Sequence, residues 1–187
     1  LYKNPTVVNN VETLAAATGI LLNGPEKFSA IGNKKSAGTK LVCFDSFFNN
    51  PGVYEIEMGT PMKKVLYEIG GGFKEDVKAL QIGGPLGGVV PIQEVEKLNL
   101  DFQEFTTAGF MLGHASIVSI PKDFPMVEYI HHLFEFTAEE SCGKCFPGRL
   151  GSYRGKEMFD QLKSKTSKIP LKLLNELLIT MKKGCLC

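Results

Sequence analysis

The stretch NNPGVYEIEMGTPMKKVLYEIGG, residues 49–71, predicts a strand followed by a short helix. After an Asn-Asn-Pro-Gly turn, apolar and polar side chains alternate as in a half-buried strand. One face carries Val53, Glu55 and Glu57, and the other carries Tyr54, Ile56 and Met58. Thr60 is then expected to cap an amphipathic helix, with Pro61 at its first position and Gly70 at its end.

The segments on either side of this stretch extend the β pattern. KLVCFD (40–45) precedes it, and three further apolar runs follow it. These runs are VKALQIGG (77–84), GGVVPI (87–92) and ASIVSIP (115–121). Two strands, a helix and then further strands is the order of a β-grasp domain, in which a mixed sheet carries a helix across one face.

Both ends of the chain have helical periodicity. Residues 9–31 are expected to form a helix capped by Asn10 and a second, shorter helix that ends at Gly32. The polar, Gly-containing segment 33–39 then predicts a boundary. The sequence as a whole predicts an α+β chain of three parts. These are 1–36, a short helical tail; 37–122, a β-grasp domain; and 123–187, a helical bundle.

Three helical segments make up the predicted bundle. The first places an apolar stripe on one face, and the others are YRGKEMFDQLKSK (153–165) and PLKLLNELLITMKK (170–183). The stripe consists of Val127, Ile130, Leu133 and Phe134. A bundle of this order brings the loop after the first helix near the end of the third.

The composition is that of an ordinary globular protein, 43% hydrophobic and 22% charged, with a net charge of +1. This balance gives no electrostatic reason to expect nucleic acid or an anionic membrane as a partner. No apolar run reaches the roughly 18 residues that span a bilayer. The N-terminus has no signal-peptide pattern and no initiating Met, so we expect a piece of a longer chain without direct membrane insertion.

Four of the five cysteines crowd into the C-terminal region. Cys142 and Cys145 form a C-x-x-C pair, and Cys185 and Cys187 form a C-x-C pair just past the last predicted helix. This pattern argues against an extracellular disulfide framework and favours a reducing, cytoplasmic setting. By spacing alone an iron–sulfur cluster and a zinc site are equally good interpretations, and a redox dithiol or unliganded thiols are the alternatives.

Two other motifs invite a functional interpretation. GGPLGG (83–88) fits neither common phosphate-binding pattern and is expected to form tight turns close to other backbone. The adjacent His131 and His132 point about 100° apart on a helix, so they are expected to be packed or solvated rather than to share a metal.

Three motifs together resemble one family. NPTVVNNVETL, QIGGPLGG and ESCGKCFPGR occur in this order in the NADH-binding flavoprotein subunit of respiratory complex I and of soluble NAD(P)-dependent hydrogenases and formate dehydrogenases. The resemblance covers essentially the whole chain. It implies that the chain contains the end of an FMN domain, a β-grasp module of the SLBB type and a bundle that holds a [4Fe–4S] cluster.

The resemblance also implies site residues. FMN would contact Val8, Asn9, Asn10 and Thr13, whose amide and hydroxyl groups suit a ribityl phosphate or a flavin edge. The alternative is that this segment is only a capped helix. NAD(P)H would bind to the full-length subunit upstream, and partners would be other subunits of a multisubunit oxidoreductase, including a small iron–sulfur thioredoxin-like subunit.

The cluster loop departs from the family pattern at one position. The family loop reads E-S-C-G-K-C-x-P-C-R, and Gly148 stands where its third Cys falls. Cys142, Cys145 and Cys187 match family ligands, whereas Cys185 stands where the family has Ser or Thr. Three explanations are open. Cys185 substitutes for the missing ligand, the cluster is absent or incomplete, or Gly148 is a variant of the usual residue. Gly148 has no side chain to bind iron, and Cys185 and Cys187 would diverge in an extended chain, so that both could bind one cubane only through a tight turn. We therefore expect no intact [4Fe–4S] cluster in this fragment.

The predicted function is therefore NAD(P)H oxidation and electron relay within a larger oxidoreductase, with the fragment inactive by itself. The rival prediction is a non-enzymatic docking scaffold or a zinc-stapled binding module.

Overall fold

The computed structural model describes residues 1–166 and 168–186, which fold as two compact units. Unit 1 is Leu1–Ser119 and unit 2 is Ile120–Cys187. Unit 1 contains a mixed sheet with helices and unit 2 is mainly helical, so the predicted α+β class is confirmed. The three segments expected from the sequence stay a prediction. No helix within the described residues is both long and apolar enough to cross a membrane.

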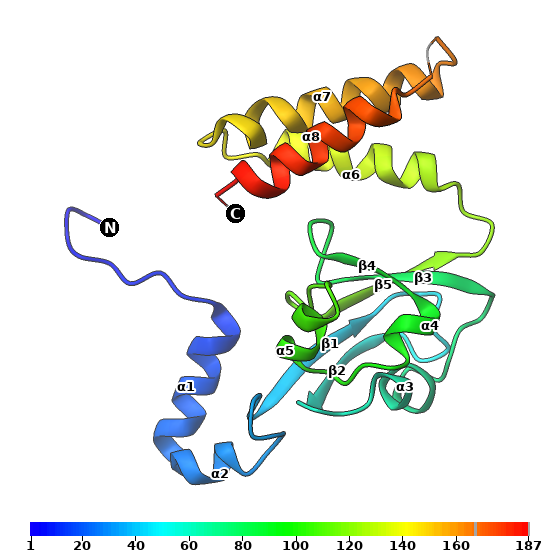
Figure 1. Ribbon diagram of the computed structural model, residues 1–187. Helices are drawn as coiled ribbons and strands as arrows, with labels where there is room; N and C mark the ends of the chain where they lie inside the picture. Colours follow the sequence, from blue (N-terminus) through cyan, green and yellow to red (C-terminus); the bar gives the residue numbers. More distant parts are fainter. Residues whose placement is uncertain (167, 187) are drawn as a thin grey trace. The chain divides into compact units, whose positions relative to one another are not determined.

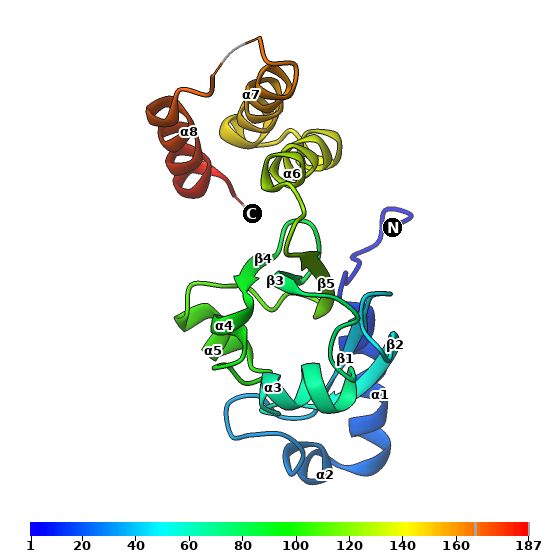
Figure 2. The same cartoon turned by 90° about the vertical axis from the view of Figure 1, so that its right-hand side faces the viewer.

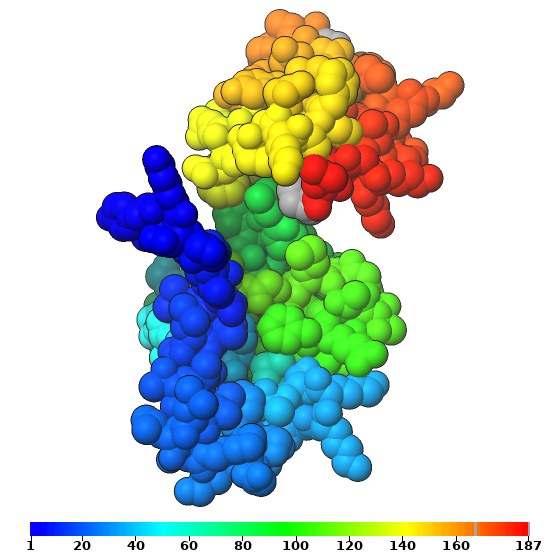
Figure 3. All heavy atoms as spheres, turned by 90° about the vertical axis from the view of Figure 1, so that its left-hand side faces the viewer, coloured from blue at the N-terminus to red at the C-terminus, as the bar shows by residue number. Residues whose placement is uncertain are grey.

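Unit 1 begins with two helices, α1 (Val11–Asn23) and α2 (Pro25–Ser29). The side chain of Asn10 accepts hydrogen bonds from the amides of Glu12 and Thr13, which confirms it as the cap of α1. Residues 1–10 are all exposed, and Figure 3 shows this N-terminal segment, in dark blue, extending from the helix that follows it.

The described part of unit 1 has one five-stranded sheet, in the order β2-β1-β5-β3-β4 (Figure 1). Its strands are β1 (Thr39–Phe44), β2 (Gly52–Glu57), β3 (Val77–Ile82), β4 (Gly88–Pro91) and β5 (Ser116–Pro121). β1 pairs antiparallel with β2 and parallel with β5, and β3 pairs antiparallel with β4. The alternation predicted for residues 53–58 is confirmed, because Ile56 and Met58 are buried while Val53 is exposed.

Short helices cover one face of this sheet (Figure 2). They are α3 (Met62–Lys64), the π-helical turn η1 (Val65–Ile69), α4 (Ile92–Val95) and α5 (Phe102–Thr107). The core of unit 1 lies between the sheet and these helices, where Val42, Leu66, Leu80 and Phe105 are fully buried. The predicted start of the first of these helices was wrong by one residue. Pro61 is the cap of α3 rather than its first residue, because its extended ψ of 130° precedes the helix.

The described part of unit 2 contains three helices, α6 (Met126–Glu140), α7 (Phe146–Lys163) and α8 (Leu171–Gly184). α7 packs against both others, and Figure 2 shows it between them. Glycines in α7 permit this close packing. A Cβ at Gly155 would lie 2.1 Å from the ring of Phe134 in α6, and one at Gly151 would lie 2.8 Å from Met181 in α8.

Two details of unit 2 differ from the sequence prediction. The stripe expected on α6 is wrong in part, because Val127 is 39% exposed and the buried residues are Tyr129, His131, Phe134 and Ala138. The second helix begins at Phe146 rather than near Tyr153. Its first turn contains Pro147, which a helix tolerates there because the first amides have no partner within the helix.

Candidate metal centre

The C-x-x-C pair lies in the connection between α6 and α7, as predicted. α6 ends at Glu140, and Cys145 is the residue that caps the start of α7. Cys142 is exposed, and Cys145 is partly buried. The Cys145 side chain is therefore placed at the first turn of a long helix, whereas Cys142 is on the loop before it.

Arg149 holds this loop, and sequence reasoning had not singled it out. Its guanidinium Nη1 donates to the carbonyl oxygen of Gly143 at 2.9 Å, and its amide donates to the carbonyl of Cys145 at 3.0 Å. The guanidinium also lies 6.0 Å from the ring centre of Phe146. The sequence did carry a signal for this role, because the cationic Arg149 stands shortly after the C-x-x-C pair and could bind the loop carbonyls.

Cys185 reaches the same place from the opposite end of unit 2. It caps the C-terminus of α8, and its amide donates to the carbonyl of Met181 at 3.0 Å. The end of α8 lies against the start of α7, because a Cβ at Gly184 would be 2.9 Å from the Pro147 ring. Figure 1 shows the last turn of α8, in red, beside the yellow start of α7, and Figure 3 shows the same red and yellow surfaces in contact.

The thiols of Cys145 and Cys185 lie within hydrogen-bonding reach of each other. The backbone amides of Leu186 and Gly148 also point at the Cys145 sulfur. These two amides, with a smaller contribution from the Cys185 thiol, lower the pKa of Cys145 below its usual value. The predicted meeting of the C-x-x-C loop and the end of the third helix is thus confirmed for Cys145 and Cys185.

Gly148 lies beside this thiol pair. A Cβ built at position 148 would lie 2.9 Å from the Cys145 sulfur, 3.6 Å from the Cys185 sulfur and 4.0 Å from the Ser141 hydroxyl. The side chain missing at this position would therefore point directly at the two sulfurs.

The type and position of these sulfurs can be compared with what a thiolate-bound cluster requires. Soft sulfur donors suit iron, and two of them converge at one point. Cys142 does not join them, and within residues 1–166 and 168–186 no group of three or more His, Cys, Asp or Glu side chains is arranged to hold a metal. Cys187 lies outside the described residues. The donor chemistry and the convergence fit a cluster, and the described geometry supplies part of its ligand set.

The residues expected at FMN lie apart from this thiol pair in the chain, in the first part of unit 1. Val8, Asn9, Asn10 and Thr13 are all exposed. The Asn9 side chain accepts from the amide of Asn10 at 2.8 Å, and the Asn10 side chain caps α1. Both amide side chains thus already bind backbone in this structure.

The remaining motifs have structural roles. Gly83 and Gly84 have φ angles of 85° and 93°, and a Cβ at Gly83 would lie 2.7 Å from the carbonyl of Leu112. The prediction of tight turns close to backbone is confirmed. His131 is buried in unit 2 and its Nε2 lies 2.6 Å from Asp160 Oδ1, while His132 is exposed.

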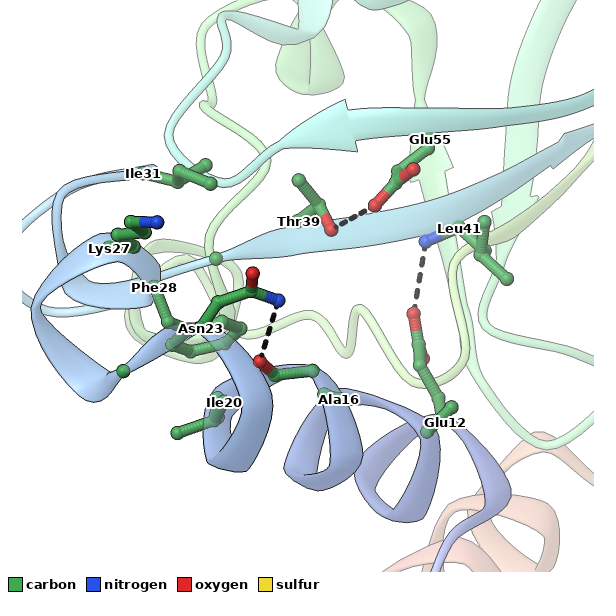
Figure 4. A pocket seen from close by; sticks show the side chains of 14 residues that line it. Glu12, Ala16, Ile20, Asn23, Lys27, Phe28, Ile31, Thr39, Leu41 and Glu55 are labelled. Atoms are coloured by element: carbon green, nitrogen blue, oxygen red, sulfur yellow. Dashed lines mark hydrogen bonds between the residues drawn. The ribbon is translucent and has the colours of Figure 1, made fainter.

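A cavity of about 650 Å³ lies in unit 1 between the two N-terminal helices and the β1–β2 edge (Figure 4). Much of its polar lining is already engaged. Glu12 binds Lys40 and the amide of Leu41, Thr39 donates to Glu55 at 2.7 Å, and Asn23 donates to the Gly19 carbonyl. The cavity consequently presents a largely apolar wall.

Comparisons with known proteins agree with the position of the thiol pair. Residues 128–187 match the family described as the NADH-ubiquinone oxidoreductase-F iron-sulfur binding region. Cys142, Cys145, Gly148 and Cys185 all fall within this match.

Relatives extend the similarity over the whole chain. The chain is 35% identical to the NADP-reducing hydrogenase subunit HndC of Solidesulfovibrio fructosivorans over 189 residues, which covers 100% of this chain and 38% of that protein. It is 42% identical to an NADH-quinone oxidoreductase subunit of Rhizobium meliloti (strain 1021) over 153 residues, which covers 81% of this chain and 36% of that protein. The chain thus spans little more than a third of either relative.

A solved structure matches the fold as well. The crystal structure of an NAD⁺-reducing [NiFe]-hydrogenase in the H₂-reduced state superposes with a TM-score of 0.84 at 29% identity. The match covers 98% of this chain and 31% of that one. Together these matches confirm that the chain resembles subunits of NADH-quinone oxidoreductases and of NAD(P)-reducing hydrogenases.

Proposed function

We propose that this relative of the NADH-binding flavoprotein subunits is part of an NAD(P)H-oxidising subunit, and that unit 2 carries its iron–sulfur cluster. The observation that best supports this is the convergence of the Cys145 and Cys185 sulfurs beside position 148, inside the matched iron–sulfur region. Within the described residues no other part of the chain brings two thiols together.

The names of the relatives support the reaction class. One is an NADP-reducing hydrogenase subunit and another an NADH-quinone oxidoreductase subunit, so both names combine a nicotinamide with a second redox partner. When bound, FMN exchanges two electrons with nicotinamide and a cluster carries electrons singly. The full-length subunit would hold FMN and NAD(P)H, and the present chain would provide the exit route.

Cysteines of unit 2 are the proposed ligands. Cys142 and Cys145 come from the loop before α7, and Cys187 keeps the role that the resemblance gives it. Arg149 positions the loop by its hydrogen bond to the Gly143 carbonyl. The amides of Leu186 and Gly148 point at the Cys145 sulfur, where they favour the deprotonated form that binds metal.

The start of unit 1 is the proposed flavin side. Val8, Asn9, Asn10 and Thr13 are exposed and lie at the N-terminus of α1, where amides and the helix dipole favour phosphate. The middle of the chain would be the SLBB module. The partners would be other subunits of a cytoplasmic oxidoreductase, including a small iron–sulfur thioredoxin-like subunit, and the chain alone would have no NAD(P)H activity.

The test is the metal content of the chain purified without oxygen. We expect iron and acid-labile sulfide in equal amounts, with broad visible absorption that dithionite bleaches. Cys145→Ser should lose both, whereas Cys43→Ser, a change in β1 of unit 1, should keep both. A colourless chain with stoichiometric zinc would show the zinc-stapled alternative instead.

A further inference from the structure

The position that lacks a ligand and the cysteine that is extra in this chain lie beside each other. A side chain at position 148 would start 3.6 Å from the Cys185 sulfur. A sulfur carried at position 148 would lie one bond beyond that Cβ, in the region where the Cys145 and Cys185 sulfurs already lie. A sulfur on residue 148 of α7 and the sulfur of Cys185, after α8, would therefore lie in the same region.

We propose that Cys185, beside Cys145, supplies the iron ligand that Gly148 cannot supply. This inference rests on the proposed function and adds one named ligand to it. Each iron–sulfur bond forms as the thiol releases its proton to solvent, and solution supplies sulfide with equal amounts of ferric and ferrous iron, so no separate oxidant is needed.

Helix packing explains how Cys185 comes to this point. Gly184 lies against Pro147, and Gly151 lets Met181 approach α7 one turn further along. These two contacts hold the C-terminal end of α8 at the N-terminal end of α7. Cys185 follows immediately, with φ −76° and ψ 145°, so the chain leaves the helix at this residue.

The backbone directly after Cys185 also lies beside the thiol pair, because the amide of Leu186 points at the Cys145 sulfur. Cys187 lies outside the described residues.

The surroundings of position 148 also leave room for a cysteine in place of Gly148. The nearest atoms to a Cβ at Gly148 are two thiol sulfurs and a hydroxyl oxygen, all ends of side chains rather than backbone. A cysteine at position 148 would move the Cys145 sulfur by rotation about its own bonds. The chain thus accepts a sulfur from either position.

The experiment compares four chains reconstituted anaerobically with sulfide and an equal mixture of ferric and ferrous iron. They are the wild type, Cys185→Ser, Cys43→Ser and the double variant Gly148→Cys with Cys185→Ser. Iron and labile sulfide are measured after desalting and after challenge with a ferrous chelator. Helix content by circular dichroism shows that each variant is folded.

We expect the wild type and Cys43→Ser to bind equal iron. Cys185→Ser should bind iron about tenfold more weakly or worse. Even the loss of a residue that only hydrogen-bonds to a metal ligand lowers metal affinity by about that factor. The double variant should regain iron, because its new sulfur points to the same place.

Three results would overturn the inference. If Cys185→Ser retains as much iron as the wild type, Cys185 is no ligand, and the proposed function still stands. If a folded double variant regains no iron, the two positions are not equivalent. If the wild type itself binds no iron, both the inference and the proposed function fail.

Discussion

Unit 1 and unit 2 are each stabilised by a different kind of internal packing. The sheet of unit 1 encloses large side chains completely, such as Phe48, Leu66 and Leu80, each with 0% exposure. α8 of unit 2 buries no residue along its length, and its contact with α7 depends on glycines that let backbone and side chains approach closely. A closed apolar core stabilises a fold by itself, whereas a thin helical packing gains more from a metal that ties its ends together.

The largest expected effect is in the core of unit 1. Phe48 packs against Phe44 and Phe73, with ring centres 4.6 and 4.7 Å apart. Phe48→Ala should destabilise the fold by about 3–5 kcal/mol, the usual cost of removing a buried aromatic ring. Hydrogen exchange by mass spectrometry should show lost protection first in β1–β5. Equal loss of protection in α6–α8 would contradict separate stabilisation of the two units.

In unit 2 a single added methyl group should be harmful. Gly155→Ala would place a Cβ 2.1 Å from the Phe134 ring, so it should cost about 1–3 kcal/mol of unfolding free energy despite the better helix propensity of Ala. Gly19→Ala is the matched control in α1. Nothing lies within 4 Å of its new Cβ, so it should stabilise by about 0.5–1 kcal/mol. Chemical denaturation of both variants checks the prediction, and equal shifts in one direction would refute it.

A smaller effect is expected at the cap of α5 in unit 1. The Asp101 carboxylate is buried and accepts from the Gln103 and Glu104 amides and from the Asn33 side chain at 2.8–3.0 Å. Asp101→Ala should cost about 1–2 kcal/mol, as for other lost caps. Asp101→Asn, which keeps a capping oxygen, should cost less.

The same carboxylate predicts a pH dependence. Burial by itself would raise the pKa of Asp101, but the hydrogen bonds from Asn33 and from the backbone amides outweigh it and lower the pKa below its usual value. The stabilisation is therefore present above the unfolded pKa and is lost as the pH falls through the lower folded value. Denaturation midpoints measured from neutral to acid pH should fall less steeply for Asp101→Asn. Identical slopes would exclude this carboxylate as a cause.

The smallest effect is expected where α1 meets the sheet. Glu12 binds Lys40 and accepts from the Leu41 amide at 3.0 Å, and α1 has no buried residue. The Glu12 side chain is 33% exposed, so Glu12→Gln should lower the free energy of unfolding by only about 0.5–1 kcal/mol. Amide exchange at Leu41 should become faster. An unchanged rate would mean that α1 is held to β1 by other contacts.

The sequence predicted unit 1 better than unit 2 for a physical reason. Strict alternation in residues 53–58 reports one buried face directly, and Asn10 has the side chain that a helix cap requires. On α6 the expected stripe was wrong in part, because the buried face includes His131, whose Nε2 contacts Asp160, 29 residues away. No local pattern encodes such a pairing.

The start of α7 was missed because its first turns look like a loop. Gly and Pro in CFPGRLGS are poor helix formers, but Pro147 suits a first turn, and Gly151 is needed for the approach of α8. For the site, the order of the three helices predicted that the C-x-x-C loop and the end of the last helix meet. It could not show that residue 148 faces Cys185, because that depends on how α7 and α8 pack.

The central claim reverses the expectation of no intact cluster that was drawn from the sequence: we propose that unit 2 binds a four-iron cluster although Gly148 replaces a ligand. Electron paramagnetic resonance of the anaerobically reconstituted chain, before and after dithionite, tests this most directly. We predict no signal before reduction and the signal of a reduced [4Fe–4S] cluster afterwards. A signal present before reduction and lost afterwards, as for a three-iron cluster, or no signal in either state, would contradict the claim.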